Sequence, residues 1–109
     1  TGTTFVRGDI HQLRAPRNPQ GHEQASHRYA VVVQSDDLPL STLLVAPTST
    51  AARPTSFRPE IEIDGRPTRV LTEQTTAVDP TRLGPWKGRL STRELQQVDA
   101  ALRLVLALD

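Results

Sequence analysis

Short apolar runs, separated by polar segments that contain proline and glycine, predict a small protein built mainly of β-strands. Tyr29–Gln34 and Leu43–Ala46 are continuous apolar runs, typical of strands buried on both faces. Acid and isoleucine alternate at Glu60–Ile63, which predicts one buried and one solvent-facing side. Asp64-Gly65 follows, and this strong hairpin signal predicts a returning strand over Arg66–Leu71.

Two more strands are expected near the chain ends, over Phe5–Leu13 and Trp86–Leu90. Pro67 cannot donate a ladder hydrogen bond, so it predicts that the returning strand of the hairpin lies at a sheet edge. Trp86 is interpreted as a packing residue rather than a platform for stacking bases.

Helical signals are confined to the last third of the chain. Asp79 as N-cap, Pro80 at the first helical position and Gly84 as terminator predict a single helical turn. A capping box at Ser91-Thr92-Arg93-Glu94 predicts a long helix over Thr92–Leu108. One face of this helix is apolar and is expected to pack against the core or a second copy, and its residues are Leu95, Val98, Leu102, Val105 and Leu106.

Five to seven short strands and one closing helix predict a mainly β fold with α content, a small β-barrel with a C-terminal helix against it. The 109 residues are expected to form one domain, residues 1–109. Apolar residues make up 36% of the chain, so the core is modest and a second subunit is expected to cover part of the surface. No cysteine is present and no apolar run reaches transmembrane length, so we expect a cytoplasmic protein without membrane contact.

The net charge is only +1, but two connecting segments are positive while the acids gather elsewhere. Between residues 10 and 34, Arg14, Arg17 and Arg28 face a single acid, Glu23. Between residues 43 and 59 there are two arginines and no acid. Positive loops of this kind favour an anionic partner, and arginine binds phosphate through two parallel hydrogen bonds.

Two segments carry candidate chemistry. The stretch Gly21–Val33 (GHEQASHRYAVVV) places Glu23 in a polar loop and Arg28 where that loop becomes a strand. The stretch Leu43–Thr50 (LLVAPTST) ends an apolar strand in three hydroxyl residues. Acid, arginine and hydroxyl groups at strand ends suit chemistry on a phosphodiester. Two plainer readings stay open: Arg28 as a surface ion-pair partner of Glu23, and Ser49 as a simple strand end.

These segments, in order, resemble the MazF/PemK family of toxins from bacterial toxin–antitoxin pairs. Arg7-Gly8-Asp9-Ile10 is similar to the family's opening strand, and GHEQASHRYAVVV is similar to its Gly-x-Glu…Arg-Pro-Ala-Val-Val segment. LVAPTST is similar to its Pro-x-Thr/Ser strand end, and LTEQTTAVDPTRLG and the helix ELQQVDAALRLVLAL also fit. The chain departs from the pattern at Tyr29, where the family usually has proline, and at Ser49, where threonine is common.

The resemblance implies an SH3-like barrel of the PemK/CcdB type, a homodimer, and a metal-independent endoribonuclease without cofactor. Its substrate would be single-stranded messenger RNA, cut at short sequence motifs by attack of the 2′-OH. It also implies a cognate MazE-like antitoxin whose flexible tail occupies the RNA groove. The alternative is a toxin of the same fold that binds a protein such as gyrase and leaves RNA intact.

The resemblance also assigns roles to residues. Arg28 would clamp the phosphoryl oxygens, Glu23 is a candidate general base, and Ser49 is the first choice for the hydroxyl donor by spacing. Thr48 is a second catalytic candidate, because which hydroxyl of the Thr48–Thr50 run faces the site is open. The residues expected to bind RNA are Arg14, Arg17, His27, Thr50, Arg53, Arg58 and Gln74. His11, His22 and His27 lack supporting ligand spacing, so no metal site is expected.

Overall fold

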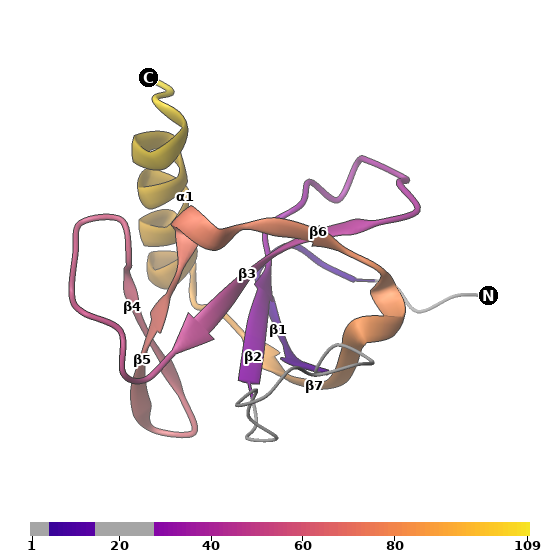
Figure 1. The fold of residues 1–109 in the computed structure, drawn as a ribbon, viewed down its shortest axis with the longest axis horizontal. Helices are drawn as coiled ribbons and strands as arrows, with labels where there is room; N and C mark the ends of the chain where they lie inside the picture. The colour runs from indigo at the N-terminus through magenta and orange to yellow at the C-terminus, as the bar shows by residue number, and fades with distance from the viewer. Residues whose placement is uncertain (1–4, 15–27) are drawn as a thin grey trace, which may run out of the picture.

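Strands dominate the architecture, as the apolar pattern predicts. The computed structural model describes residues 5–14 and 28–109. The strands are β1 (Asp9–Leu13), β2 (Arg28–Val32), β3 (Leu43–Ser49), β4 (Glu60–Ile63), β5 (Arg66–Val70), β6 (Thr76–Val78) and β7 (Leu83–Arg89). Two short 3₁₀ helices, η1 (Thr72–Gln74) and η2 (Pro80–Arg82), and the helix α1 (Thr92–Leu106) complete the fold. Figure 1 shows the strands curling into a barrel-like sheet with α1 at one side, which confirms the predicted fold class.

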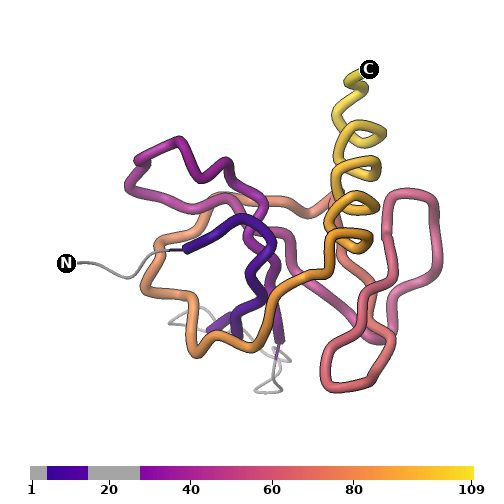
Figure 2. The backbone as a smooth tube through the Cα atoms, turned by 180° about the vertical axis from the view of Figure 1, so that it is seen from behind, coloured from indigo at the N-terminus to yellow at the C-terminus, as the bar shows by residue number. Residues whose placement is uncertain are grey.

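The seven strands form one antiparallel sheet with β3 at its centre. The strand order is β4-β5-β3-β2-β1-β7, and β6 also pairs with β3. Over its seven residues β3 changes partner: Leu43–Val45 pair with β6, and Thr48 and Ser49 pair with β5. In the ribbon of Figure 1 and in the backbone tube of Figure 2, seen from behind, α1 stands beside the β4–β5 hairpin. The Glu94 carboxylate accepts a hydrogen bond from the Glu62 amide at 2.9 Å, which ties the helix to this hairpin.

The sheet buries both faces, as the continuous apolar run in β2 predicts. Successive side chains of a strand point to opposite faces. Val31 and Val33 therefore join the core cluster that α1 covers, and Ala30 and Val32 join a second cluster on the other face. The first cluster consists of Ile10, Val31, Val33, Ala46, Ile61, Ile63, Val70, Leu90 and Val98. The second consists of Ala30, Val32, Leu43, Val45, Val78 and Leu83.

The predicted capping box begins α1. The Ser91 hydroxyl accepts from the Glu94 amide at 3.1 Å, and the Glu94 carboxylate accepts from the Ser91 amide at 2.9 Å. The helix ends at Leu106, earlier than expected, because Ala107 takes the left-handed conformation with φ = 56°. On its apolar face Val98 is fully buried, whereas Val105 and Leu106 stay exposed in this chain alone.

Three local expectations are wrong, and each depends on tertiary neighbours. Strand β5 is not an edge strand, because β3 pairs with Val70 and Arg69, at the end of β5 remote from Pro67. Gly84 does not end a helix but lies in β7, where a Cβ atom would come within 3.3 Å of the Gln12 carbonyl oxygen of β1. Trp86 is not a packing residue in this chain, since it is 59% exposed.

The hairpin signal at Asp64-Gly65 is confirmed. Both residues have positive φ, 54° at Asp64 and 74° at Gly65, as a two-residue type I′ turn requires. Isoleucines of β4 point into the core, so the hairpin is held at its base and its tip projects beside the ends of β2 and β3. Within residues 5–14 and 28–109, α1 is too short and too polar to cross a membrane, and no other helix there qualifies.

Asp9, buried to 3% exposure, joins the chain start to β7. Its carboxylate accepts from the Val6 amide at 3.1 Å and from Arg89 Nε at 2.8 Å. Burial alone would raise the pKa of Asp9, but the hydrogen bonds from Arg89, Val6 and Trp86 outweigh it, and the pKa is lowered.

This lowered pKa predicts acid sensitivity. The folded state binds the Asp9 proton less readily than the unfolded state, so Asp9 adds stability above its unfolded pKa of about 3.9 and loses it as pH falls further. We expect Asp9→Asn to be less stable than the parent near neutral pH and to show a shallower loss of stability between about pH 5 and pH 3. Urea unfolding across this range measures both, with exposed Asp37→Asn as control. An unchanged acid slope in Asp9→Asn would contradict the assignment.

Candidate functional site

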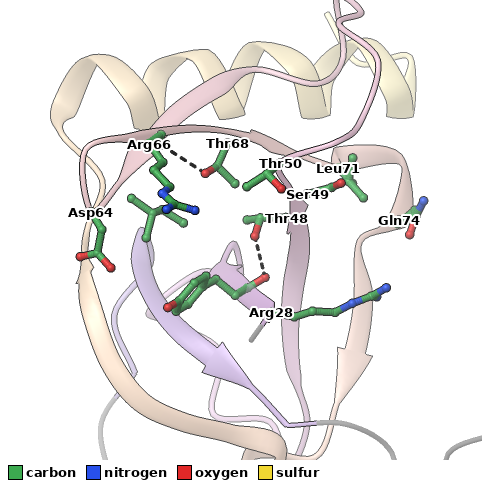
Figure 3. A pocket seen from close by; sticks show the side chains of 11 residues that line it. Arg28, Thr48, Ser49, Thr50, Asp64, Arg66, Thr68, Leu71 and Gln74 are labelled. Atoms are coloured by element: carbon green, nitrogen blue, oxygen red, sulfur yellow. Dashed lines mark hydrogen bonds between the residues drawn. The ribbon is translucent and has the colours of Figure 1, made fainter. Parts of the chain in front are cut away.

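A cleft of about 830 Å³ opens where β2 begins, β3 ends and the β4–β5 hairpin projects. Its walls come from four segments that are far apart in the sequence. They are Arg28, Tyr29, Thr48, Ser49, Thr50, Ile63, Asp64, Arg66, Thr68, Leu71 and Gln74 (Figure 3). Arg28 and all three hydroxyl residues at the end of β3 therefore share one cleft.

The sheet register explains which side chains meet in the cleft. Ala30 pairs with Pro47 across the β2–β3 ladder. Continuing this antiparallel register places Arg28 opposite Ser49 and Tyr29 opposite Thr48, and opposed residues share a face. In Figure 3, Arg28 and Gln74 lie on one side of the strand that carries the hydroxyl residues, while Asp64, Arg66 and Thr68 lie on the other.

The three neighbouring hydroxyls have different surroundings. The Thr48 side chain is buried to 8% exposure, and its hydroxyl donates to the Tyr29 carbonyl at 3.0 Å. The Ser49 oxygen accepts from the Ala51 amide at 3.2 Å, so its hydrogen is left to donate. Thr50 is exposed at the rim. Ser49 is thus the hydroxyl that combines a free donor with a position opposite Arg28.

The charges of the cleft favour an anion. Among the described residues, neither Arg28 nor Arg66 forms an ion pair with a carboxylate. The one acid in the lining, Asp64, is neutralised by Lys87, whose Nζ lies 2.7 Å from its Oδ2. The hydrogen bond that Lys87 donates to Asp64 raises the pKa of Lys87. Two unpaired guanidinium groups therefore set the sign of the potential in this cleft.

The structure brings only some of the sequence-named residues together. Thr50 and Gln74 line the cleft with Arg28, whereas Arg14, Arg53 and Arg58 do not. Three further named residues, Arg17, Glu23 and His27, lie outside the described residues.

Arg58 is held by Glu73, an acid fifteen residues further along the chain. Its Nε and Nη2 donate to Glu73 Oε2 at 3.0 and 2.6 Å. This hydrogen bonding lowers the pKa of Glu73 and raises that of Arg58. The pair connects the loop before β4 to η1, the turn that carries Gln74. Arg58 therefore supports the edge of the cleft rather than lining it.

Sequence reasoning missed Tyr29, Asp64, Arg66 and Thr68 as site residues. The hairpin turn was visible in the sequence, but that its tip faces β2 is a tertiary fact. The exchange of the family's proline for Tyr29 was the one available signal at this position.

A second cavity, of about 1180 Å³, has a more apolar lining and lies away from Arg28. Phe5, Leu38, Leu40 and Trp86 line it together with Arg14. His11 is buried there, with Nδ1 3.0 Å from the Gly84 carbonyl oxygen and its ring edge-on to Phe5. In the part of the chain that the structure describes, no group of three or more His, Cys, Asp or Glu side chains is placed to hold a metal ion.

Comparison with known proteins gives one curated relative above 40% identity. A Mycobacterium tuberculosis protein named as a candidate toxin, Rv3098A, is 44% identical over 69 residues, which are 63% of this chain and 65% of that protein. The chain thus spans just under two thirds of the length of this relative.

Solved structures share the fold at low sequence identity. The Mycobacterium tuberculosis toxin MazF-mt6 matches with a TM-score of 0.75 at 18% identity, over 93% of this chain and 98% of that one. A MazE–MazF crystal structure from Deinococcus radiodurans matches with a TM-score of 0.78 at 20% identity, over 99% of this chain and 100% of that one. An endoribonuclease from a mycobacterial species, solved in complex with its cognate antitoxin, matches with a TM-score of 0.76 at 13% identity, over 96% and 97% of the two chains.

The family comparison covers nearly the whole chain. The model of the PemK-like, MazF-like toxins of type II toxin–antitoxin systems matches residues 6–106, which include every strand and α1. The chain therefore belongs to the PemK-like, MazF-like family of toxins from type II toxin–antitoxin systems.

Proposed function

We propose that this toxin is a metal-independent endoribonuclease that cuts single-stranded RNA. The observation that carries the proposal is that Arg28, which has no ion pair among the described residues, and the Ser49 hydroxyl line one open cleft with a positive balance of charge. A structural neighbour named as an endoribonuclease supports the same activity.

RNA supplies its own nucleophile, so the proposed reaction needs a base, a proton for the leaving oxygen, and groups that stabilise the charge on the phosphate. The 2′-oxygen attacks the adjacent phosphorus, the bond from phosphorus to the 5′-oxygen breaks, and a 2′,3′-cyclic phosphate and a 5′-OH result. A base takes the 2′ proton, and the leaving 5′-oxygen receives one. Arg28 binds the two non-bridging oxygens as negative charge builds on them, and the Ser49 hydroxyl donates to a phosphoryl or leaving oxygen. Glu23, outside the described residues, stays the proposed base.

The proposed partners follow from charge and exposure. An acidic antitoxin segment would compete with RNA for the cleft that Arg28 and Arg66 line. A neighbour of the same fold is named as bound to its cognate antitoxin, which supports this assignment. A second copy of the chain would cover the apolar end of α1, where Leu104, Leu106 and Leu108 are each at least 55% exposed.

Substitution of the proposed hydroxyl donor gives a sharp expectation. Ser49→Ala removes one hydrogen bond to a charged group, worth about 1.5–3 kcal/mol, and should slow cleavage roughly 10- to 100-fold. Single-turnover rates on one RNA measure this, with exposed Ser41→Ala as control. Thr48→Val should instead lower the melting temperature, because it deletes the hydrogen bond to the Tyr29 carbonyl. Full activity in Ser49→Ala would show that another hydroxyl serves the reaction.

The proposed function is tested by incubating the purified protein with a long unstructured RNA in EDTA and mapping the ends. Cleavage at a short recurring motif, with 2′,3′-cyclic phosphate and 5′-OH ends, is expected. Growth arrest by the expressed protein with intact cellular RNA would contradict the nuclease and favour a protein target such as gyrase.

A further inference from the structure

The side of the cleft away from Arg28 combines aromatic, acidic and basic side chains. Alternation along β2 sends Tyr29 to the face opposite Arg28, and the hairpin residues Asp64, Arg66 and Thr68 line the same cleft with it. We call these four residues the Tyr29 pocket. Figure 3 shows that the hairpin residues of this group lie across the strand end from Gln74 and the Arg28 guanidinium.

The Tyr29 pocket differs from a plain phosphate site. The Tyr29 ring is half-buried against the core, and Lys87 Nζ lies 5.8 Å from its centroid. Lys87 holds Oδ2 of Asp64, and among the described residues no side-chain hydrogen bond engages Oδ1. An aromatic plane, a guanidinium without an ion pair among the described residues, and a carboxylate oxygen that can accept hydrogen bonds together fit a planar ring with polar edges.

We propose that the Tyr29 pocket binds the nucleobase next to the phosphate held by Arg28 and so sets base preference at one position of the RNA. This inference rests on the proposed function. Arg28 and Tyr29 are successive residues at the start of β2 and line the same cleft, so a phosphate bound by the first can leave its nucleoside beside the second. The base stacks on the Tyr29 ring, and Arg66 and Asp64 contact its polar edge.

Tyr29 supplies the aromatic surface of this pocket, on which a base can stack. The stacking itself does not depend on base identity, because every base has a π-face. Arg66 and Asp64 supply the discrimination, since a guanidinium binds base acceptors and a carboxylate binds base amino groups. We therefore expect Tyr29 to control the affinity for RNA and Arg66 to control the preference for one base.

Tyr29 is the only tyrosine of the chain and Trp86 the only tryptophan, which makes the test specific. The ring signals of ¹³C-tyrosine-labelled protein are followed by NMR during titration with 2′-O-methyl pentanucleotide pools, which lack the nucleophile and stay intact. Binding is measured in parallel by anisotropy of the labelled pools. The matched probe carries one abasic site in the same backbone, scanned through the five positions. Trp86, in the second cavity, is the internal reference.

Stacking predicts an upfield shift of the Tyr29 ring protons, a steady Trp86 signal, and loss of the tyrosine shift with one of the abasic probes. Affinity should fall roughly 5- to 100-fold in Tyr29→Leu and much less in Tyr29→Phe. Binding with unmoved tyrosine signals would overturn this inference and leave the nuclease proposal standing. Failure of the pools to bind at all would overturn both. A shift with an acidic peptide but not with the pools would assign the pocket to a protein partner and also overturn it.

Preference is tested by cleavage of an RNA library randomised around the cut site. In Arg66→Gln, discrimination at one position should fall while cutting persists. The matched control is Arg69→Gln, because Arg69 pairs with Glu60 and does not line the cleft. An Arg66→Gln profile that keeps every base preference of the parent would overturn the role of Arg66.

Discussion

Arg28→Ala should cut RNA roughly 10²- to 10³-fold more slowly than the parent, a loss of about 3–4 kcal/mol of transition-state stabilisation. Negative charge grows on the phosphoryl oxygens as the 2′-oxygen attacks, and β2 carries Arg28 at the cleft, where its guanidinium can bind that charge. Arg28 is exposed and has no ion pair among the described residues. Its removal should therefore change the free energy of unfolding by no more than about 0.5 kcal/mol.

Rate and stability together make this prediction decisive. Arg28→Lys should be intermediate, because an ammonium keeps the charge but not the two parallel hydrogen bonds. Arg93→Ala, which removes the same charge from an exposed position on α1, should cut at the parental rate. A slow Arg28→Ala with a parental melting temperature supports the account. Cleavage at the parental rate by Arg28→Ala would contradict the proposed role of Arg28 in binding the phosphoryl oxygens.

Ile61→Ala should lower the free energy of unfolding by about 2–5 kcal/mol. Ile61 is 2% exposed and lies in the core cluster between the sheet and α1. The truncated side chain leaves a cavity there, so the cost exceeds simple transfer of methyl groups to water. A loss of this size is a large part of the stability of a domain this small.

Urea unfolding measures the effect, with Leu106→Ala as the matched control. Leu106 is 60% exposed at the end of α1, so its truncation should cost about 0.5 kcal/mol or less at concentrations where the chain is monomeric. Ile61 also anchors the hairpin that carries Arg66, so base preference should weaken before the chain unfolds. Equal stability of the two variants would contradict the placement of Ile61 in the core.

Local signals predicted the elements that local physics determines. The alternation of β4, the Asp64-Gly65 turn and the Ser91 capping box each involve residues close in sequence, and all three are confirmed. Pro67 and Gly84 were interpreted wrongly because their environments depend on which strand lies alongside. The same limit explains the wrong interpretation of Trp86, because the burial of a tryptophan depends on which segments pack against it.

The residues of the candidate site could also be predicted only in part from the sequence. The resemblance placed Arg28 and Ser49 in one site, and the β2–β3 register now sets them opposite each other. Arg66 was not foreseen, because nothing in the sequence states that the hairpin tip faces Tyr29. Arg58 was expected at the RNA, but its bonding to Glu73 involves an acid fifteen residues away that no local pattern pairs with it.

The central claim is that the cleft helps a ribose hydroxyl attack its own phosphate, and one substrate tests it most directly. Once the cut site is mapped, an RNA is made with a single 2′-deoxyribose on the 5′ side of the scissile bond. The account predicts that this RNA binds like the parent RNA and is not cut at that bond in EDTA. Cleavage at the same bond without the 2′-OH would contradict the account, because the nucleophile would then have to come from elsewhere.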